Sequence, residues 1–121
     1  MAKKIMLLLI ALMFAFVIFN DYAWGQFRTG SDLVMLWRSH QQVVNRPGNT
    51  TGEEVQKSMW FKGYVSGVVD ARVNTLYVPP GVIASQLCHI VGQYLDAHPN
   101  EWHENGADLV VKAIRNAFPK K

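Results

Sequence analysis

The sequence predicts an all-α protein, a compact bundle of four main helices that follows an N-terminal signal peptide. Apolar residues recur at intervals of three and four in four segments, which is the helical period. No stretch alternates with period two over a useful length, and Pro or Gly residues separate the four segments. The 121 residues suffice for one domain and not for two. We therefore expect a signal peptide at residues 1–25 and a helical domain at residues 26–121.

The first residues have the pattern of a secretory leader. Lys3 and Lys4 precede a run of fifteen uncharged, almost wholly apolar residues. Ala23 and Gly25 supply small residues at the two positions that a signal peptidase reads, so we expect cleavage after Gly25. Cleavage after Ala23 is the second choice, because Asp21 would then lie where a small residue is preferred. The run is shorter than the roughly 20 residues of a membrane span, so a retained anchor is less favoured than export.

The charge balance gives little support for nucleic-acid binding. The formal net charge is +3, and removing Lys3, Lys4 and Asp21 with the leader lowers it to +2. The helical domain has no run of Lys or Arg except Lys120-Lys121, and no basic stripe interleaved with aromatic residues. We expect no nucleic-acid partner.

The first helix of the domain follows a short lead-in, where Thr29 or Ser31 can cap it. The segment Arg46-Pro47-Gly48-Asn49-Thr50 ends it, because Pro and Gly break the pattern. The residues expected to face inward are Leu33, Leu36, Trp37, His40 and Val44.

The second helix is the expected centre of the bundle. Thr51 and Glu54 form a capping box that opens it, and it extends to about Arg72. A mid-helix Gly costs roughly 1 kcal/mol relative to Ala, so Gly63 and Gly67 predict the close approach of another helix; the alternative is a helix that merely tolerates them. The expected inner stripe consists of Val55, Met59, Gly63, Tyr64, Gly67 and Val68.

Two more helices complete the domain. After a loop from Val73 to Gly81, a third helix is expected from about Ile83 to Ala97, with Leu87, Ile90, Val91, Tyr94 and Leu95 on its inner face. Pro99 suits the first turn of a fourth helix, which Pro119 ends. The inner face of the fourth helix is expected to hold Trp102, Gly106, Leu109, Val110, Ala113, Ile114 and Ala117.

The sequence lacks the common catalytic and metal-binding patterns. His98 and His103 are five residues apart without a His-Glu-x-x-His spacing, so we expect no metal. Cys88 is expected to be a buried, inert thiol, because adjacent helical residues such as His89 point in different directions. There is no Gly-rich phosphate loop, Gly-x-Ser-x-Gly elbow or Cys-x-x-Cys pair. We expect neither a cofactor nor an enzyme.

Asp70 is the one acid in an otherwise apolar or small part of the second helix. A buried carboxylate there is either an acid catalyst or a brace for the following loop, and buried charges are normally paired. Arg72 or the backbone N–H groups of residues 73–76 are possible partners. With no second carboxylate or His at helical spacing, we favour the bracing role.

Five motifs occur in a recognisable order. They are Phe27-x-x-Gly30-x-x-Leu33, Gly63-Tyr64-Val65-x-Gly67-Val68-x-Asp70-Ala71, Val78-Pro79-x-Gly81-Val82, Gln86-Leu87 with Tyr94-Leu95-x-x-His98-Pro99, and Ala117-Phe118-Pro119. Together they make the chain resemble the Rap/Tai-type immunity proteins, which protect bacteria from peptidoglycan amidases delivered by type VI secretion systems. The resemblance implies a small helical periplasmic protein, commonly a homodimer, that binds a cognate amidase and blocks its active site without turnover.

The chain departs from this family at four positions. As we align them, family members usually carry Cys where this chain has Trp37, Phe61, Tyr77 and Lys120, and the resemblance implies that the first two and the last two would be linked. We infer that Trp37 packs on Phe61 in place of the covalent link. A lost disulfide costs about 2–5 kcal/mol, and an aromatic pair adds about 0.5–1.5 kcal/mol beyond its burial, so compensation is partial.

The polar loops are the expected contact surfaces, because the helix faces are committed to the core. The candidate partner-binding residues are Arg46, Asn49, Thr50, Arg72 and Asn74; the alternative is that they are only solvated connectors. The residues expected to have structural roles are Trp37, Phe61, Gly63, Tyr64, Gly67 and Asp70.

Two other functions compete with the immunity interpretation. A periplasmic stress or acid-protective chaperone would bind many clients weakly and respond to low pH as His40, His89, His98 and His103 charge near pH 6 to 7. A small hydrolase would need a catalytic constellation that the sequence lacks.

Overall fold

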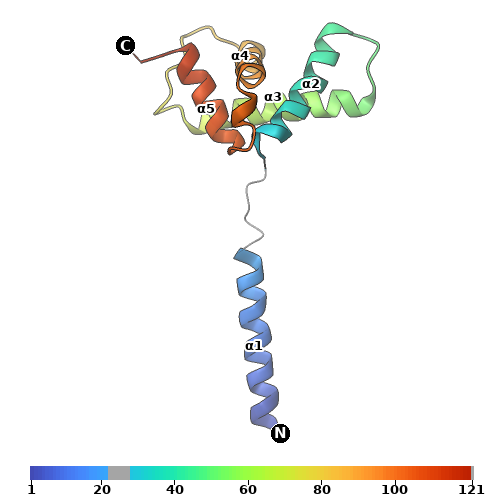
Figure 1. Ribbon diagram of the computed structural model, residues 1–121, viewed down its shortest axis with the longest axis vertical. Helices are drawn as coiled ribbons and strands as arrows, with labels where there is room; N and C mark the ends of the chain where they lie inside the picture. Colours follow the sequence, from blue (N-terminus) through green and yellow to red (C-terminus); the bar gives the residue numbers. More distant parts are fainter. Residues whose placement is uncertain (22–27, 121) are drawn as a thin grey trace.

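The computed structural model describes residues 1–21 and 28–120 of the chain, with five α-helices and one short 3-10 helix in that part. The α-helices are α1 (Ala2–Asp21), α2 (Gly30–Asn45), α3 (Gly52–Ala71), α4 (Ala84–Ala97) and α5 (Gly106–Ala117), and the 3-10 helix is η2 (Pro99–Glu101). The last four α-helices form a compact bundle, as the sequence predicts, and Figure 1 draws α1 apart from it.

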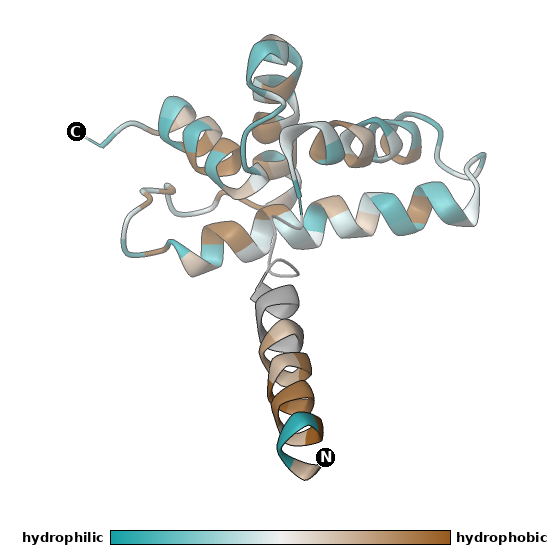
Figure 2. Ribbon diagram, turned by 60° about the horizontal axis from the view of Figure 1, so that its bottom comes forward, coloured by the Kyte–Doolittle hydropathy of each residue, from teal (hydrophilic) through white to brown (hydrophobic). Residues whose placement is uncertain are grey.

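The leader segment forms α1, which is strongly apolar along most of its length (Figure 2). None of the helices in the described residues is both long enough and apolar enough to cross a membrane. The expected cleavage sites after Ala23 and Gly25 lie outside the described residues.

Capping boxes open both α2 and α3. The backbone N–H of Thr29 donates to Asp32 Oδ2 at 2.8 Å, and Thr29 Oγ1 accepts from the backbone N–H of Asp32 at 3.4 Å. The predicted box of α3 is confirmed, because the Thr51 N–H donates to Glu54 Oε2 at 2.9 Å and Thr51 Oγ1 accepts from the Glu54 N–H at 3.2 Å. Each box satisfies backbone donors that a helix start otherwise leaves unpaired.

The prediction for the fourth helix is wrong at its start. Pro99 opens the 3-10 helix η2, and α5 begins only at Gly106, where the Asn105 side chain caps it by accepting the Ala107 N–H at 2.9 Å. Trp102 therefore lies before the helix, although it still packs against the core and donates its indole N–H to the Leu95 carbonyl at 2.8 Å. Ala117, the last residue of α5, is exposed rather than buried.

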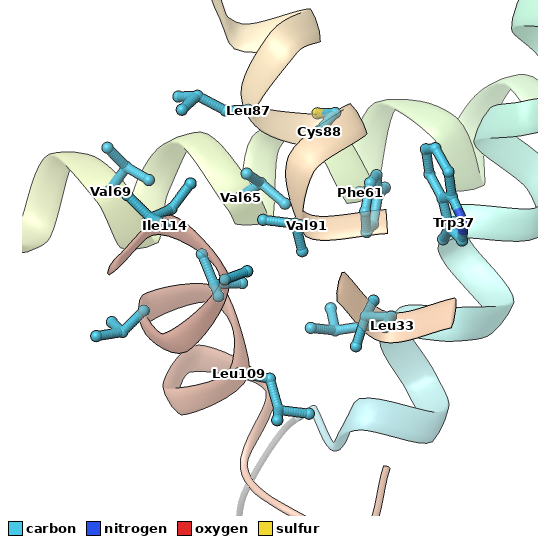
Figure 3. Close-up of a cluster of buried hydrophobic side chains, with 14 of the residues drawn as sticks. Leu33, Trp37, Phe61, Val65, Val69, Leu87, Cys88, Val91, Leu109 and Ile114 are labelled. Atoms are coloured by element: carbon cyan, nitrogen blue, oxygen red, sulfur yellow. The ribbon is translucent and has the colours of Figure 1, made fainter. Parts of the chain in front are cut away.

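One hydrophobic core joins the four helices, and Figure 3 shows how its side chains converge. Val44 is an exception to the prediction for α2, since it is 62% exposed near the end of the helix. The buried apolar residues are Leu33, Val34, Leu36, Trp37, Phe61, Val65, Val69, Leu76, Leu87, Cys88, Val91, Leu95, Leu109, Val110, Val111, Ala113 and Ile114.

The face of α3 that packs in the core is not the predicted one. Phe61, Val65 and Val69 are buried together with Ser58, and Tyr64 and Val68 pack partly against the core. Four members of the expected stripe face outward, namely Val55, Met59, Gly63 and Gly67. Both sets follow an i, i+4 spacing, so periodicity alone cannot choose between them.

Gly63 and Gly67 therefore do not mark a close approach within the bundle. A Cβ built at either position meets nothing within 4 Å. Each glycine still costs the helix roughly 1 kcal/mol relative to Ala, so packing among the described residues does not account for them.

The close approach occurs at Gly92 of α4 instead. A Cβ there would overlap the indole ring of Trp37, so the aromatic ring lies directly on the α4 backbone. The predicted pair is confirmed, because the ring centroids of Trp37 and Phe61 are 5.6 Å apart at an angle of 40°. The Trp37 indole N–H donates to Asp96 Oδ2 at 3.0 Å, which fixes the ring between α2, α3 and α4.

Backbone hydrogen bonds tie the start of α2 to the segment before α5. The N–H groups of Gly30 and Ser31 donate to the carbonyls of Glu104 and Trp102 at 3.0 and 2.9 Å, and the Gly106 N–H donates to the Arg28 carbonyl at 2.9 Å. A Cβ at Gly30 would lie 2.7 Å from the Trp102 Cα, so only glycine fits. We call these residues, 28–31 and 102–106, the terminal clamp.

Candidate partner-binding surface

The structure separates the predicted contact residues into two groups. Arg46, Asn49 and Thr50 lie before the first residue of α3, and Arg72 and Asn74 follow its last residue. A helix of 20 residues is about 30 Å long, and Figure 1 shows the two loops at its opposite ends. One small contact cannot use both groups.

The α2–α3 loop is a tight turn with exposed side chains. The Arg46 N–H donates to the Gln42 carbonyl at 2.9 Å, and the Asn49 N–H donates to the Arg46 carbonyl at 3.1 Å. Gly48 adopts φ of 83°, the left-handed region that favours glycine. Arg46 and Asn49 are exposed, and Thr50 is half-buried.

The α3–α4 loop is held at its start by the Arg72 carbonyl. This oxygen accepts the N–H groups of Thr75 and Leu76 at 2.9 and 2.8 Å. Leu76 is buried in the core, whereas the Arg72, Val73 and Asn74 side chains are exposed. The loop therefore presents these side chains from an anchored backbone.

Two hollows flank the end of α3. The polar hollow has a volume of about 490 Å³ and is lined by Arg72, Glu104, Asn105, Asp108, Val111, Lys112 and Arg115. The apolar hollow has a volume of about 440 Å³ and is lined by Val69, Asp70, Val73, Leu76, Tyr77, Val78, Val82 and Leu87.

Ion pairs neutralise one wall of the polar hollow. The Lys112 ammonium donates to Glu104 at 2.7 Å and to Glu101 at 3.0 Å. The hydrogen bonds that Lys112 donates to Glu104 and Glu101 raise the pKa of Lys112, and the hydrogen bonds that Glu101 accepts from Tyr94 and Lys112 lower the pKa of Glu101. None of the salt bridges among residues 1–21 and 28–120 involves Arg72 or Arg115, so both guanidinium groups are available to a carboxylate or carbonyl of a partner.

Asp70 is exposed and is one of the residues that line the apolar hollow, contrary to the expected buried brace. It contributes to the following loop through its backbone carbonyl, which accepts the Val73 N–H at 3.5 Å. A solvated carboxylate needs no internal partner, and here it adds a negative charge beside the exposed Val73 and Tyr77.

A pair of polar groups that the sequence analysis missed lies between α2 and α3. His40 Nδ1 and Ser58 Oγ are 2.8 Å apart, and Ser58 is 7% exposed. The two residues are 18 positions apart with no sequence motif joining them, so only the packing of the helices reveals the contact. Burial, followed by the charge of Lys62, lowers the pKa of His40. Because Ser58 is covered, the pair is suited to holding the helices together rather than to attacking a substrate.

Cys88 is fully buried in the core, as predicted, and burial raises the pKa of its thiol to about 11. Such a thiol is protonated and unreactive at neutral pH. Across the described ranges, no three His, Cys, Asp or Glu side chains are grouped so as to hold a metal ion.

Comparison with protein families matches residues 29–119 to the Rap1a immunity proteins, a type VI secretion immunity family. The match includes α2, α3, α4, η2 and α5, and begins after α1. Comparisons with curated proteins and with solved structures gave no match. Because the match spans the whole helical bundle, the chain belongs to the Rap1a immunity protein family.

Proposed function

We propose that this protein is a periplasmic immunity protein, which binds a cognate peptidoglycan amidase delivered by a type VI secretion system and occludes its active site. The observation that carries the proposal is the family match over residues 29–119. Inhibition of this kind requires a tight complex and no turnover, so the protein needs a binding surface rather than catalytic groups.

The proposed location rests on the leader. Lys3 and Lys4 followed by the apolar segment of α1 match a signal peptide, and the substrate of a peptidoglycan amidase lies outside the inner membrane. Fractionation of cells that express the full chain should recover it from the periplasm. Mass spectrometry should give an N-terminus at Gln26; an uncleaved chain in the membrane fraction would contradict this part of the proposal.

We propose that the amidase contacts the surface at the end of α3. Arg72 and Arg115 supply guanidinium groups that form no ion pair with the other described residues, and Val73 and Tyr77 supply exposed apolar area beside them. Arg and Tyr are among the residues that most often dominate binding energy at interfaces. The Arg46 loop at the other end of α3 is exposed too, and it provides the matched comparison.

The test has two steps. The protein is first used to capture its partner from bacterial cells that contain the secretion effectors, and the captured protein is assayed for cleavage of peptidoglycan. Wild-type protein should abolish this cleavage at a stoichiometric ratio. Arg72→Glu should weaken inhibition by about tenfold or more, the effect expected of a central contact, while Arg46→Glu should change it by less than about threefold.

Each outcome has a separate meaning. Capture of no amidase, or capture of many weak clients only at acid pH, would refute the immunity function and favour the chaperone. Amidase inhibition that is lost with Arg46→Glu and kept with Arg72→Glu would retain the function and move the contact to the α2–α3 loop.

We also propose that the protein is a homodimer.

A further inference from the structure

We propose that the outer face of α3 binds the same face of a second copy of the chain, with the two helices antiparallel and crossing at Gly63. This inference deepens the homodimer part of the proposed function and rests on it. The α3 outer face is defined here by Gln56, Met59, Trp60, Gly63, Gly67 and Asp70.

This face has no partner within the bundle. In Figures 1 and 2, α3 forms one edge of the domain, and α2, α4 and α5 lie on one side of it. Met59 is 68% exposed and Trp60 is 48% exposed on the other side, and a Cβ at Gly63 or Gly67 would point into open space. Two large apolar side chains thus lie beside two positions with no side chain, on the longest helix of the bundle.

The arrangement is complementary to itself. Met59 and Gly67 both lie four residues from Gly63, in opposite directions along the helix. In an antiparallel pair with a two-fold axis at Gly63, Met59 of each copy therefore faces Gly67 of the other. Such symmetric contacts are the rule in two-fold interfaces, and a large side chain set against glycine allows two helices to approach closely. This gives the two glycines a role that packing inside the bundle does not give them.

The polar residues of the face select the antiparallel direction. Gln56, Gly63 and Asp70 are spaced by seven residues, and each interval of seven residues changes the direction around the helix axis by only about 20°. The three residues therefore lie on nearly the same side of α3. The antiparallel pair sets the Asp70 carboxylate against the Gln56 amide, which can donate a hydrogen bond to it, at both ends of the interface. A parallel pair would set the two Asp70 carboxylates against each other, and like charges repel.

Trp60, a member of this face, also has a contact with a residue outside α3. The Arg28 guanidinium lies over its ring, 5.8 Å from the ring centroid. This cation–π contact limits the motion of a large apolar side chain that is otherwise half exposed. A side chain that is already restricted before binding loses less conformational entropy when the dimer forms.

The size of the face predicts a weak dimer. A helix about 30 Å long and about 10 Å wide offers less than the roughly 800 Å² per partner of a typical stable interface. Sedimentation of the exported protein, purified from cells that express the full chain, should therefore show monomer and dimer between about 1 and about 300 µM. Gly67→Leu fills the position opposite Met59, and it should raise the dissociation constant at least about tenfold.

Cysteine crosslinking tests the direction of the pair. Chains carrying Met59→Cys and chains carrying Gly67→Cys are mixed and oxidised, and the buried native Cys88 does not take part. The antiparallel dimer predicts a mixed disulfide between the two kinds of chain. Met35→Cys is the matched control, because Met35 is also an exposed methionine, 61% exposed, but lies on α2.

The outcomes decide the proposal independently of the amidase. A dominant mixed disulfide, weakened association with Gly67→Leu and no crosslink through Met35→Cys would support it. A monomer at every concentration, or Met59→Cys that crosslinks with itself as readily as with Gly67→Cys, would overturn it. Neither readout involves peptidoglycan cleavage, so a failed dimer and a failed immunity function are distinguishable.

Discussion

Two glycine-to-alanine substitutions should change stability in opposite directions, although the chemical change is the same. Gly63 and Gly92 are both interior residues of α-helices, in α3 and α4. Alanine at position 63 meets open space, whereas alanine at position 92 would overlap the Trp37 ring. The comparison therefore isolates the effect of packing from the effect of helix propensity.

The structure sets the magnitude of each effect. Gly63→Ala should raise the free energy of unfolding by about 0.5–1 kcal/mol, the gain in helix propensity at an unstrained site. Gly92→Ala gains the same propensity but forces an overpacked contact, which typically costs about 1–3 kcal/mol. Trp37 cannot swing aside easily, because its N–H is bound to Asp96 and its ring lies against Phe61. We expect a net loss near 2 kcal/mol.

Urea unfolding of dilute protein measures both effects, since dilution removes any contribution from association. For a domain of this size, 1 kcal/mol corresponds to about 4–8 °C in Tm, so Gly92→Ala should melt about 8–16 °C below wild type. In a Trp37→Leu background most of the cost of Gly92→Ala should vanish, because the ring that it overlaps is gone. A Gly92→Ala variant as stable as wild type, or a cost unchanged by Trp37→Leu, would refute the reasoning.

Three further predictions follow from buried or half-buried groups. Because burial lowers the pKa of His40, the unfolded chain binds a proton at this residue more readily than the folded protein does. The free energy of unfolding should therefore fall as the pH drops below about 6.5. Urea titrations at pH 7.5 and pH 5 should show a smaller fall for His40→Gln than for the wild type. Cys88, with a pKa of about 11, should react with a thiol reagent at pH 8 only after denaturation. Rapid reaction of Cys88 in the folded protein would contradict its burial. Asp96→Ala should lower the free energy of unfolding by about 1 kcal/mol, because it removes the acceptor of the Trp37 indole N–H. Asp96→Asn keeps an acceptor oxygen, so it should lose only a small part of that stability.

Helix positions were predictable wherever the sequence carries a local signal. The capping box of Thr51 and Glu54 fixed the start of α3, and the break at Pro47-Gly48 separated it from α2. The end of α3 was expected at about Arg72, which is its C-cap residue. Such signals depend on side chains within a few residues of each other, so they are visible in the sequence.

The buried face of α3 was not predictable by the same means. The stripe of Val55 and Met59 and the stripe of Phe61 and Val65 have the same spacing, and only the second is buried. Which one faces the core depends on where α2, α4 and α5 lie, and that is a property of the whole fold. The contact of Trp37 with Phe61 was expected only because the resemblance aligned both residues with linked cysteines.

The candidate site divides in the same way. The sequence pointed to Arg72 as an exposed loop residue, but it gave no reason to pair it with Arg115, which is 43 positions further along. The hollow that brings them together forms because α5 packs beside the end of α3. The same packing leaves Asp70 in solvent, which the apolar sequence around it did not indicate.

The terminal clamp has a consequence for how the domain assembles. Its hydrogen bonds join residues about seventy positions apart, between the first turn of α2 and the segment that precedes α5. Closing so long a loop is entropically costly and gives the fold a non-local component that slows folding. A chain made from its N-terminus therefore cannot close the bundle until residue 106 is free to reach residue 28. Until then the parts of α2, α3 and α4 that α5 covers stay open to solvent, and the nascent chain is exposed to aggregation and to proteases.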